Sequence, residues 1–182
     1  GNGNMIEGEV KAQAHSLRDV EKKLRQMGAR KMADVVEEDT YYSHPKRNFA
    51  LTDEALRIRM CAGRATITYK GPKLDARSKS REEINIEVLD GKEARLMLER
   101  LGFSNVAVVR KKRRIFHLWK FELCLDRVEC VGEYVEIEAR VPKNRYRTML
   151  NSAISLLEKL HLGKTERKSY LELLLSRQEA SR

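Results

Sequence analysis

The chain has 182 residues, of which 35% are charged, and 37 Lys and Arg against 27 Asp and Glu give a formal net charge of +10. This length suits one domain with a substantial core, and no apolar run is long enough to cross a bilayer, which excludes a helical membrane protein. The cationic surplus predicts an anionic partner: nucleic acid, a membrane surface or a small polyanion.

The N-terminal residues 1–4, Gly-Asn-Gly-Asn, precede Met5, and we interpret them as a cloning remnant. We expect a single domain over residues 5–176 and a C-terminal tail over 177–182. No secretory segment is visible, so we expect a cytoplasmic protein. The three cysteines form no C-x-x-C pair and lack the ligand spacing of a zinc site.

Alternation and turn residues predict many strands and a few helices. Ser16 is a candidate N-cap, Ala62-Gly63 is a turn signal, and residues 71–80 are expected to form a mobile loop. In chain order, we expect strand 5–14, helix 16–27, strands 30–42, 54–61, 64–70 and 81–89, helix 91–101, strands 105–117, 119–130 and 133–141, helix 143–160 and a short helix at 168–174. Sequential strands of this number can close into a barrel, which removes the edges of the sheet. We therefore predict an α+β fold, with a closed or nearly closed antiparallel eight-stranded β-barrel and helices packed outside.

Most of the predicted strands carry charged residues on one face, because successive side chains of a strand alternate between faces. The residues that share these polar faces are Glu7, Glu9 and Lys11; Arg57 and Arg59; Thr66, Thr68 and Lys70; Arg81, Glu83, Asn85 and Glu87; Glu122, Cys124 and Asp126; and Glu136 and Glu138. On strand 105–117 the phase is ambiguous, since either Lys111 and Arg113 or Lys112 and Arg114 could share the inner face.

For any single strand, a solvent-exposed sheet face is the simpler explanation. Two observations favour a charged interior instead. The amphipathic helices could cover the apolar faces from outside, and the polar faces consist of Glu-x-Glu and Arg-x-Arg runs with few Ser, Gln or Asn. Arg binds phosphate oxygens with its planar fork, and carboxylates are hard ligands for Mg²⁺ or Mn²⁺. The pattern thus predicts a bore that binds a metal-bound triphosphate, and no P-loop motif is present.

Short motifs follow one another in a characteristic order. They are E-x-E-x-K at Glu7–Lys11, R-x-R at Arg57–Arg59, T-x-K-G-P at Thr68–Pro72, R-x-E at Arg81–Glu83, K-x-R-x-x-[YF] at Lys111–Phe116, L-D-x-V at Leu125–Val128, G-x-[FY]-x-E-x-E at Gly132–Glu138 and K-S-Y at Lys168–Tyr170. In this order the chain resembles the CYTH family, which includes CyaB-type class IV adenylate cyclases and thiamine triphosphatases. That family belongs to the triphosphate tunnel metalloenzymes.

The resemblance implies roles for individual residues and places Lys111 and Arg113 on the inner face. The implied ligands of Mg²⁺ or Mn²⁺ are Glu7, Glu9, Glu136 and Glu138, with Asp126 beside them. The implied triphosphate-binding residues are Lys11, Arg57, Arg59, Lys70, Arg81, Lys111, Arg113 and Lys168. The implied catalytic residues are Lys11, Arg59 and Asp126. Glu83 and Glu87 would orient the basic residues or join a second metal site.

The resemblance also implies an enzyme whose substrate is ATP, thiamine triphosphate or tripolyphosphate. A cyclase would make cyclic AMP and pyrophosphate, whereas a triphosphatase would release orthophosphate, and both would use the same tunnel charges. A base-binding pocket would involve the 71–80 loop, Tyr41, Phe49 and Tyr170. A non-catalytic polyphosphate or nucleotide sensor stays open, as does a basic nucleic-acid-binding module, although aromatic residues make up only 6% of the chain. A homodimer through an outer barrel face is a further expectation.

Overall fold

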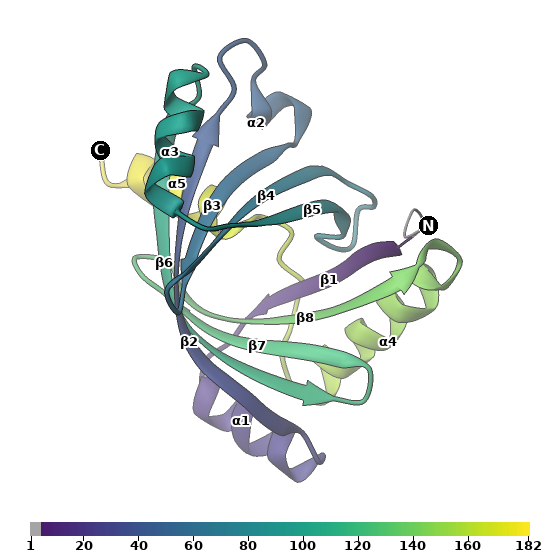
Figure 1. Ribbon diagram of the computed structural model, residues 1–182. Coiled ribbons are helices and arrows are strands. Elements are labelled where there is room, and N and C mark those ends of the chain that lie inside the picture. Colours follow the sequence, from purple (N-terminus) through teal and green to yellow (C-terminus); the bar gives the residue numbers. More distant parts are fainter. Residues whose placement is uncertain (1–4) are drawn as a thin grey trace.

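Eight antiparallel strands close into a barrel in the computed structural model, which describes residues 5–182 (Figure 1). The strands are β1 (Met5–Gln13), β2 (Arg30–Ser43), β3 (Ala55–Cys61), β4 (Arg64–Lys73), β5 (Arg81–Val88), β6 (Ser104–Leu118), β7 (Phe121–Val128) and β8 (Gly132–Pro142). Their order around the barrel is β1-β5-β4-β3-β2-β6-β7-β8. The predicted α+β barrel is therefore confirmed. Residues 1–4, interpreted above as a cloning remnant, lie outside the described residues.

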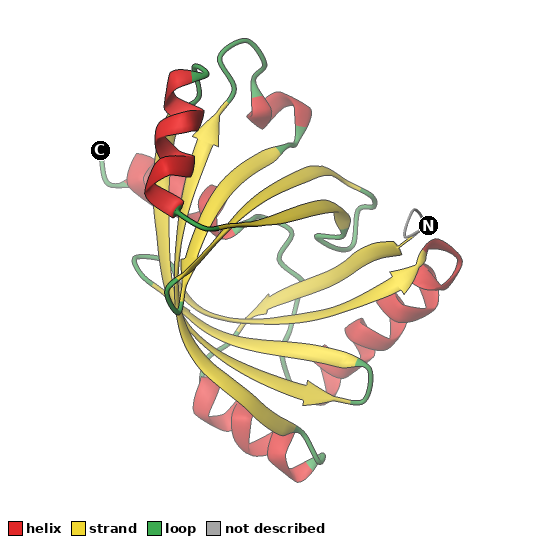
Figure 2. Ribbon diagram, in the orientation of Figure 1, coloured by secondary structure: helices red, strands yellow, loops and turns green. Residues whose placement is uncertain are grey.

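The helices are α1 (Leu17–Gln26), α2 (Phe49–Thr52), α3 (Gly91–Arg100), α4 (Tyr146–Lys159) and α5 (Tyr170–Ala180). Helices α1, α3 and α4 pack on the outer side of the barrel, as predicted (Figure 2). Helix α5 instead packs against Tyr41, Val109 and Tyr134 on the inner face of the strands, and its first turns line the cavity. Ser16 caps α1, because its side chain accepts a hydrogen bond from the Asp19 backbone N–H. Leu24 of α1 and Leu157 of α4 share one buried core with Phe116 of β6. This core holds the barrel wall from outside and leaves the inner face to polar side chains.

Two boundaries predicted near the chain end were wrong. The last helix, expected at 168–174, begins at Tyr170 and runs to Ala180, so most of the expected tail at 177–182 is part of this helix. Its start is fixed by a capping box between Ser169 and Glu172. The expected helix 143–160 begins with a 3₁₀ turn at Lys143–Arg145, and α4 proper starts at Tyr146. The leucines of α5 pack against β6, which explains the longer helix.

The predicted mobile loop at 71–80 was also wrong. β4 continues to Lys73, and Ser78, Lys79 and Ser80 are buried. The reason lies in how the barrel closes, because within residues 5–182 β1 and β5 share only the register pair Glu7–Arg81. Beside this pair, the Lys79 N–H donates to the Glu9 carbonyl at 3.0 Å, and the Glu9 N–H donates to Ser80 Oγ at 2.9 Å. The loop therefore forms part of the wall.

Strand ends elsewhere shift by a few residues from the sequence prediction. The seventh strand was expected at 119–130 but covers Phe121–Val128, because Trp119 adopts a left-handed backbone conformation (φ 56°) in the turn before it. Within residues 5–182, no helix combines the length and the apolar character needed to cross a membrane.

A candidate metal and triphosphate site inside the barrel

Four glutamates of β1 and β8 line one side of the barrel cavity: Glu7, Glu9, Glu136 and Glu138. Antiparallel pairing places Glu9 directly opposite Glu138 and places Lys11 opposite Glu136, so the two E-x-E motifs face each other. Glu9, Glu136 and Glu138 each offer an oxygen within 4.8 Å of the others. Hard carboxylate oxygens this close suit a divalent cation such as Mg²⁺ or Mn²⁺.

Electrostatics in this cluster favour the arrival of a cation. Burial, and after it the neighbouring Glu136, raises the pKa of Glu9, and burial followed by Glu9 raises the pKa of Glu138 well above its usual range. Among residues 5–182, Glu138 forms no hydrogen bond or ion pair within bonding distance. Burial would likewise raise the pKa of Glu136, but Lys79 and Arg113 hold it well below the ordinary value. An unpaired carboxylate beside two others fits a metal ligand.

Glu7 gives a pH-dependent prediction. Burial, together with Glu83 and Glu9, raises its pKa to about 7. A raised folded-state pKa stabilises the protein through the protonated form, so this contribution is present below about pH 4.5 and is lost as the pH rises through 7. We expect urea unfolding of the metal-free chain to show a decline in stability over this window that Glu7→Gln lacks. Parallel pH profiles of the two proteins would contradict it.

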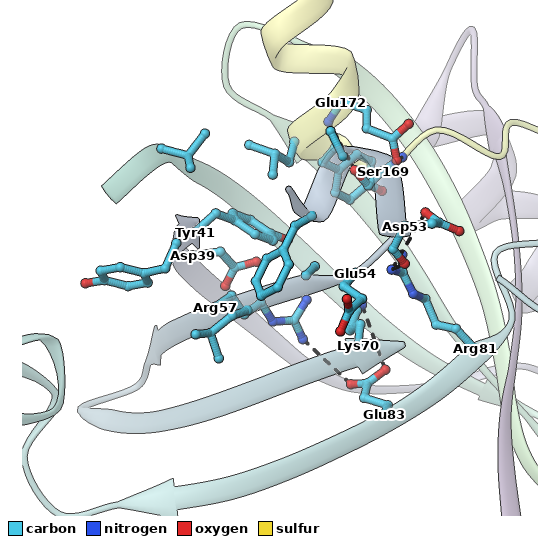
Figure 3. Close-up of a pocket in the computed structure, with 18 of the residues that line it drawn as sticks. Asp39, Tyr41, Asp53, Glu54, Arg57, Lys70, Arg81, Glu83, Ser169 and Glu172 are labelled. Atoms are coloured by element: carbon cyan, nitrogen blue, oxygen red, sulfur yellow. Dashed lines mark hydrogen bonds and ion pairs between the residues drawn. The ribbon is translucent and has the colours of Figure 1, made fainter. Parts of the chain in front are cut away.

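The opposite side of the cavity is basic (Figure 3). Figure 3 shows Arg57 and Lys70 both directed toward Glu83. The distances are 3.8 Å from each cation to a Glu83 oxygen. Arg81 is held by the backbone carbonyls of Asp53, at 2.7 Å, and Gly71. The Arg57 Nε is buried without a hydrogen-bond partner in the described chain, so this guanidinium keeps a donor for an anionic ligand.

A second row of cations is oriented by acids of β2. Arg59 makes a bidentate ion pair with Asp39, with N–O distances of 2.7 and 2.8 Å, and Lys111 donates to the same carboxylate at 2.9 Å. Glu37 lies 3.4 Å from Lys111 and 3.5 Å from Arg113. Burial would raise the pKa of Asp39, but Lys111 and Arg59 hold it well below its usual range. These acids stay ionised and fix the direction of the cations.

Arg113 links the two sides of the cavity. Its guanidinium donates to both Asp126 oxygens, at 2.7 and 2.8 Å, and to Glu136 at 3.1 Å. The Tyr170 hydroxyl donates to the same Asp126 carboxylate at 2.6 Å. Asp126 itself is fully buried and lies behind Arg113, outside the cavity lining. It therefore positions Arg113 and Tyr170 at the cavity surface.

Two other predicted site residues also lie apart from the cavity lining. Lys11 is fully buried, its Nζ donates to the backbone carbonyl of Lys168, and it lies 4.2 Å from the centre of the Tyr170 ring. The Lys168 side chain is exposed and does not line the cavity. The remaining predicted residues are brought together in the cavity: Glu7, Glu9, Arg57, Arg59, Lys70, Arg81, Lys111, Arg113, Glu136 and Glu138.

The structure adds residues that sequence reasoning missed. Asp39 lines the cavity from β2, with Glu37 two residues earlier on the same face, and Lys79 enters from the wall loop. Tyr41, Phe49 and Tyr170, expected near a base-binding pocket, also line the cavity. Glu37 and Asp39 share one face of β2, but the acid Glu38 between them hides this spacing in the sequence. The resemblance left two roles open for Glu83 and Glu87. Glu83 orients cations, whereas the Glu87 side chain is exposed and lies 3.8 Å from Arg64.

One part of the cavity is lined by apolar and aromatic side chains. The cavity has a volume of about 780 Å³, and α2, the segment before it and α5 contribute to its lining. The apolar and aromatic residues of the lining include Tyr41, Phe49, Leu56, Val106, Leu171 and Leu175. This apolar part of the lining is called the vestibule below, and the Arg and Lys side chains of the same cavity are called the basic floor. The cavity thus offers both charged and apolar surface to a ligand.

A closed barrel with facing carboxylates and inward-directed cations is suited to binding a polyanion together with a divalent cation. The family model for the CYTH domain matches residues 5–170, so the chain belongs to the CYTH family. The motif resemblance seen in the sequence is thereby confirmed.

Named relatives agree with this assignment. A Methanocaldococcus jannaschii protein named "Putative adenylate cyclase" is 37% identical over 93% of this chain and 98% of its own length. An Aeromonas hydrophila protein named "Adenylate cyclase CyaB" is 29% identical over 78% of this chain and 74% of its own. Among solved structures, PH1819 from Pyrococcus horikoshii has a TM-score of 0.88 at 39% identity, covering 94% of this chain and 99% of that one.

Proposed function

We propose that this protein is a metal-dependent enzyme that acts on an organic triphosphate, with ATP as the first candidate. The observation that carries the proposal is the juxtaposition, in one cavity, of three carboxylates within 4.8 Å and a wall of oriented Arg and Lys side chains. Phosphoryl and nucleotidyl transfer depend mainly on positioning and on charge stabilisation, so this arrangement needs no Ser or Cys nucleophile.

In this proposal the acidic residues bind the metal and the basic residues bind the phosphates. Glu7, Glu9, Glu136 and Glu138 would hold Mg²⁺ or Mn²⁺, which supplies Lewis-acid stabilisation of phosphate charge when bound. The cations that would bind the phosphate oxygens are Arg57, Arg59, Lys70, Arg81, Lys111 and Arg113. Arg59 is the proposed catalytic cation, since Asp39 holds its fork rigid at the cavity surface.

Lys11 and Asp126 take a positioning role in this proposal. Both are fully buried behind Tyr170 and Arg113, so they act through those side chains. Lys168 contributes its backbone carbonyl, which anchors the Lys11 ammonium. The exposed Lys168 side chain could still reach a substrate in the cavity, and its phosphate-binding role stays a prediction.

The vestibule supports an organic triphosphate over tripolyphosphate. An inorganic triphosphate has no group that would use the apolar side chains of Phe49, Leu56 and Leu171. A flat heterocycle would bury apolar surface there while its phosphates reach the basic floor. The names of the two curated relatives favour ATP and cyclisation to cyclic AMP.

Phe49 provides a test of this division. We expect Phe49→Ala to raise KM for ATP by about tenfold, because stacking of a base on an aromatic ring contributes roughly 1–3 kcal/mol. Turnover of tripolyphosphate should change little, since that substrate lacks a base. Leu51→Ala is the matched control, because Leu51 lies on the same short helix but is 84% exposed and outside the cavity lining. Equal effects on both substrates would contradict a base site at Phe49.

Phosphorus NMR of the purified chain tests the reaction itself. ATP, thiamine triphosphate and tripolyphosphate are each supplied with Mg²⁺ and then Mn²⁺. Cyclic AMP with pyrophosphate identifies a cyclase, and orthophosphate release identifies a triphosphatase. Binding without turnover of any substrate refutes the enzyme and leaves a non-catalytic sensor.

The partner we propose is a small molecule, because Lys and Arg side chains of four strands line a cavity of about 780 Å³, a volume that suits a small ligand. The nucleic-acid alternative predicts tight, steeply salt-dependent binding to DNA or RNA, which a filter-binding titration would detect. A cytoplasmic location agrees with three free cysteines in the described chain. A homodimer through an outer barrel face stays a prediction.

A further inference from the structure

Lys79 contacts the same carboxylates that would hold the metal. Its ammonium lies 3.2 Å from a Glu136 oxygen and 3.5 Å from a Glu9 oxygen, and the side chain is buried. Two of the three closely spaced carboxylates therefore share one ammonium group of the chain itself. Glu138, the third, has no such cation within bonding distance among the described residues.

The backbone that carries Lys79 is firmly held, so the side chain is the part that can move. The Lys79 N–H is bonded to Glu9, and Ser80 Oγ accepts the Glu9 N–H. From outside, Arg167 donates to the Asp75 carbonyl at 2.6 Å, and Ser78 Oγ lies 3.0 Å from the Tyr146 hydroxyl. A long, flexible Lys stem on a fixed backbone can swing its charge between two positions.

A divalent cation and this ammonium cannot share the two carboxylates. Metal–oxygen distances of roughly 2.0–2.6 Å would place a double positive charge where the ammonium now makes its contacts. The displaced ammonium would then face Lys70 and Arg57, which also line the cavity, and it would need an anion to stay there. A phosphate group of the substrate is the anion that the basic floor is arranged to bind.

We propose that Lys79 is an internal cation that competes with the divalent metal for Glu9 and Glu136 and, once displaced, binds the phosphate of the substrate. This inference rests on the proposed function. It makes metal and triphosphate binding cooperative, because each favours the same position of Lys79. Lys79 thereby becomes a positioning residue for the metal and a binding residue for the substrate.

The test compares Lys79→Met with Lys70→Met. Both variants lose one buried tunnel ammonium, but Lys70 lies 3.8 Å from Glu83 and forms no hydrogen bond or ion pair with Glu9 or Glu136. Titration calorimetry with Mn²⁺ alone should show binding about tenfold tighter in Lys79→Met than in the native chain. Lys70→Met should differ from the native chain by less than about threefold. Equal tightening in both variants, or none in Lys79→Met, overturns the competition.

Binding of tripolyphosphate tests the second part of the proposal, that the displaced Lys79 binds phosphate. At saturating Mn²⁺, Lys79→Met should bind it about tenfold more weakly than the native chain, whereas without metal the two should agree within about threefold. Lys70→Met should lose affinity under both conditions. A loss in Lys79→Met that does not depend on metal overturns the displacement.

Two checks keep the result interpretable. Lys79→Arg retains the positive charge, so it should bind Mn²⁺ no more tightly than the native chain. This variant keeps the test possible if Lys79→Met does not fold. Tighter Mn²⁺ binding by Lys79→Arg contradicts the competition. If the native chain itself binds no Mn²⁺, the proposed function fails. If it binds Mn²⁺ and turns over ATP while Lys79→Met gains no affinity, only the inference about Lys79 fails.

Discussion

Glu138→Gln is expected to abolish turnover while leaving the fold intact. The substitution removes a metal ligand but keeps the size of the side chain, and Glu138 makes no ion pair among residues 5–182 that its loss would break. Losing several kcal/mol of charge stabilisation corresponds to a rate loss of about a thousandfold. Steady-state assays with ATP and Mn²⁺ would measure it.

The same variant should be at least as stable as the native chain when metal is absent. Burial and Glu9 raise the pKa of Glu138, so the ionised form is disfavoured in the folded protein. The stability that comes from the protonated carboxyl is lost as the pH rises through this raised pKa, and Gln retains it. Thermal unfolding at pH 8 checks the direction.

Glu82→Gln is the matched control for both measurements. Glu82 lies on β5 next to Glu83, but its side chain is exposed and lies outside the cavity lining. It should keep near-native activity. If Glu138→Gln stays active to within about tenfold, Glu138 is not a ligand of a catalytic metal.

Arg113→Met should cause the largest loss of stability. Removing the guanidinium leaves Asp126 buried with only the Tyr170 hydroxyl as a partner and takes a cation away from Glu136. Breaking a buried ion pair by removing one partner typically costs about 3–5 kcal/mol. For a chain of this size, that lowers Tm by about 10 °C or more. Differential scanning calorimetry measures the change, and activity should fall with it, since Arg113 lines the cavity.

A double variant separates the effect of losing the Arg113–Asp126 ion pair from the effect of losing the volume of the Arg113 side chain. Arg113→Met combined with Asp126→Asn removes the stranded charge, so it should be more stable than Arg113→Met alone. Activity should not return, because the cation at the cavity surface is still missing. If the stability losses of the two single variants add up to that of the double variant, the Arg113 and Asp126 side chains are not energetically coupled. That result would contradict the 2.7 Å ion pair between them.

Strand periodicity predicted much of the inner face. Glu7 and Glu9, or Arg57 and Arg59, alternate with apolar residues, so each strand has one face that a helix can cover and one that must be polar. On β2, alternation gave no clear answer, because Glu37, Glu38 and Asp39 are consecutive acids. Only the barrel shows that Glu37 and Asp39 face inward, while Glu38 pairs with Arg110 at the surface.

Lys79 escaped prediction for a different reason. It lies in Ser78-Lys79-Ser80, a polar stretch that reads as a solvated loop. Its burial depends on hydrogen bonds to β1, which is about seventy residues away in the chain. No local pattern encodes that contact. The same limit applies to Lys168, whose motif predicts proximity to the tunnel but not that the backbone, in place of the side chain, makes the contact.

The junction between β1 and β5 has a consequence for how this fold can vary. In the described part of the chain, a single register pair and the hydrogen bonds of residues 79–80 join the two ends of an otherwise continuous eight-stranded sheet. The circumference of the barrel is therefore set partly by a loop, whose length can change without shifting any strand register. Insertions or deletions between residues 74 and 77 would alter the bore while the charged strands stay in place. The same set of charged strands could in this way accommodate ligands of different width.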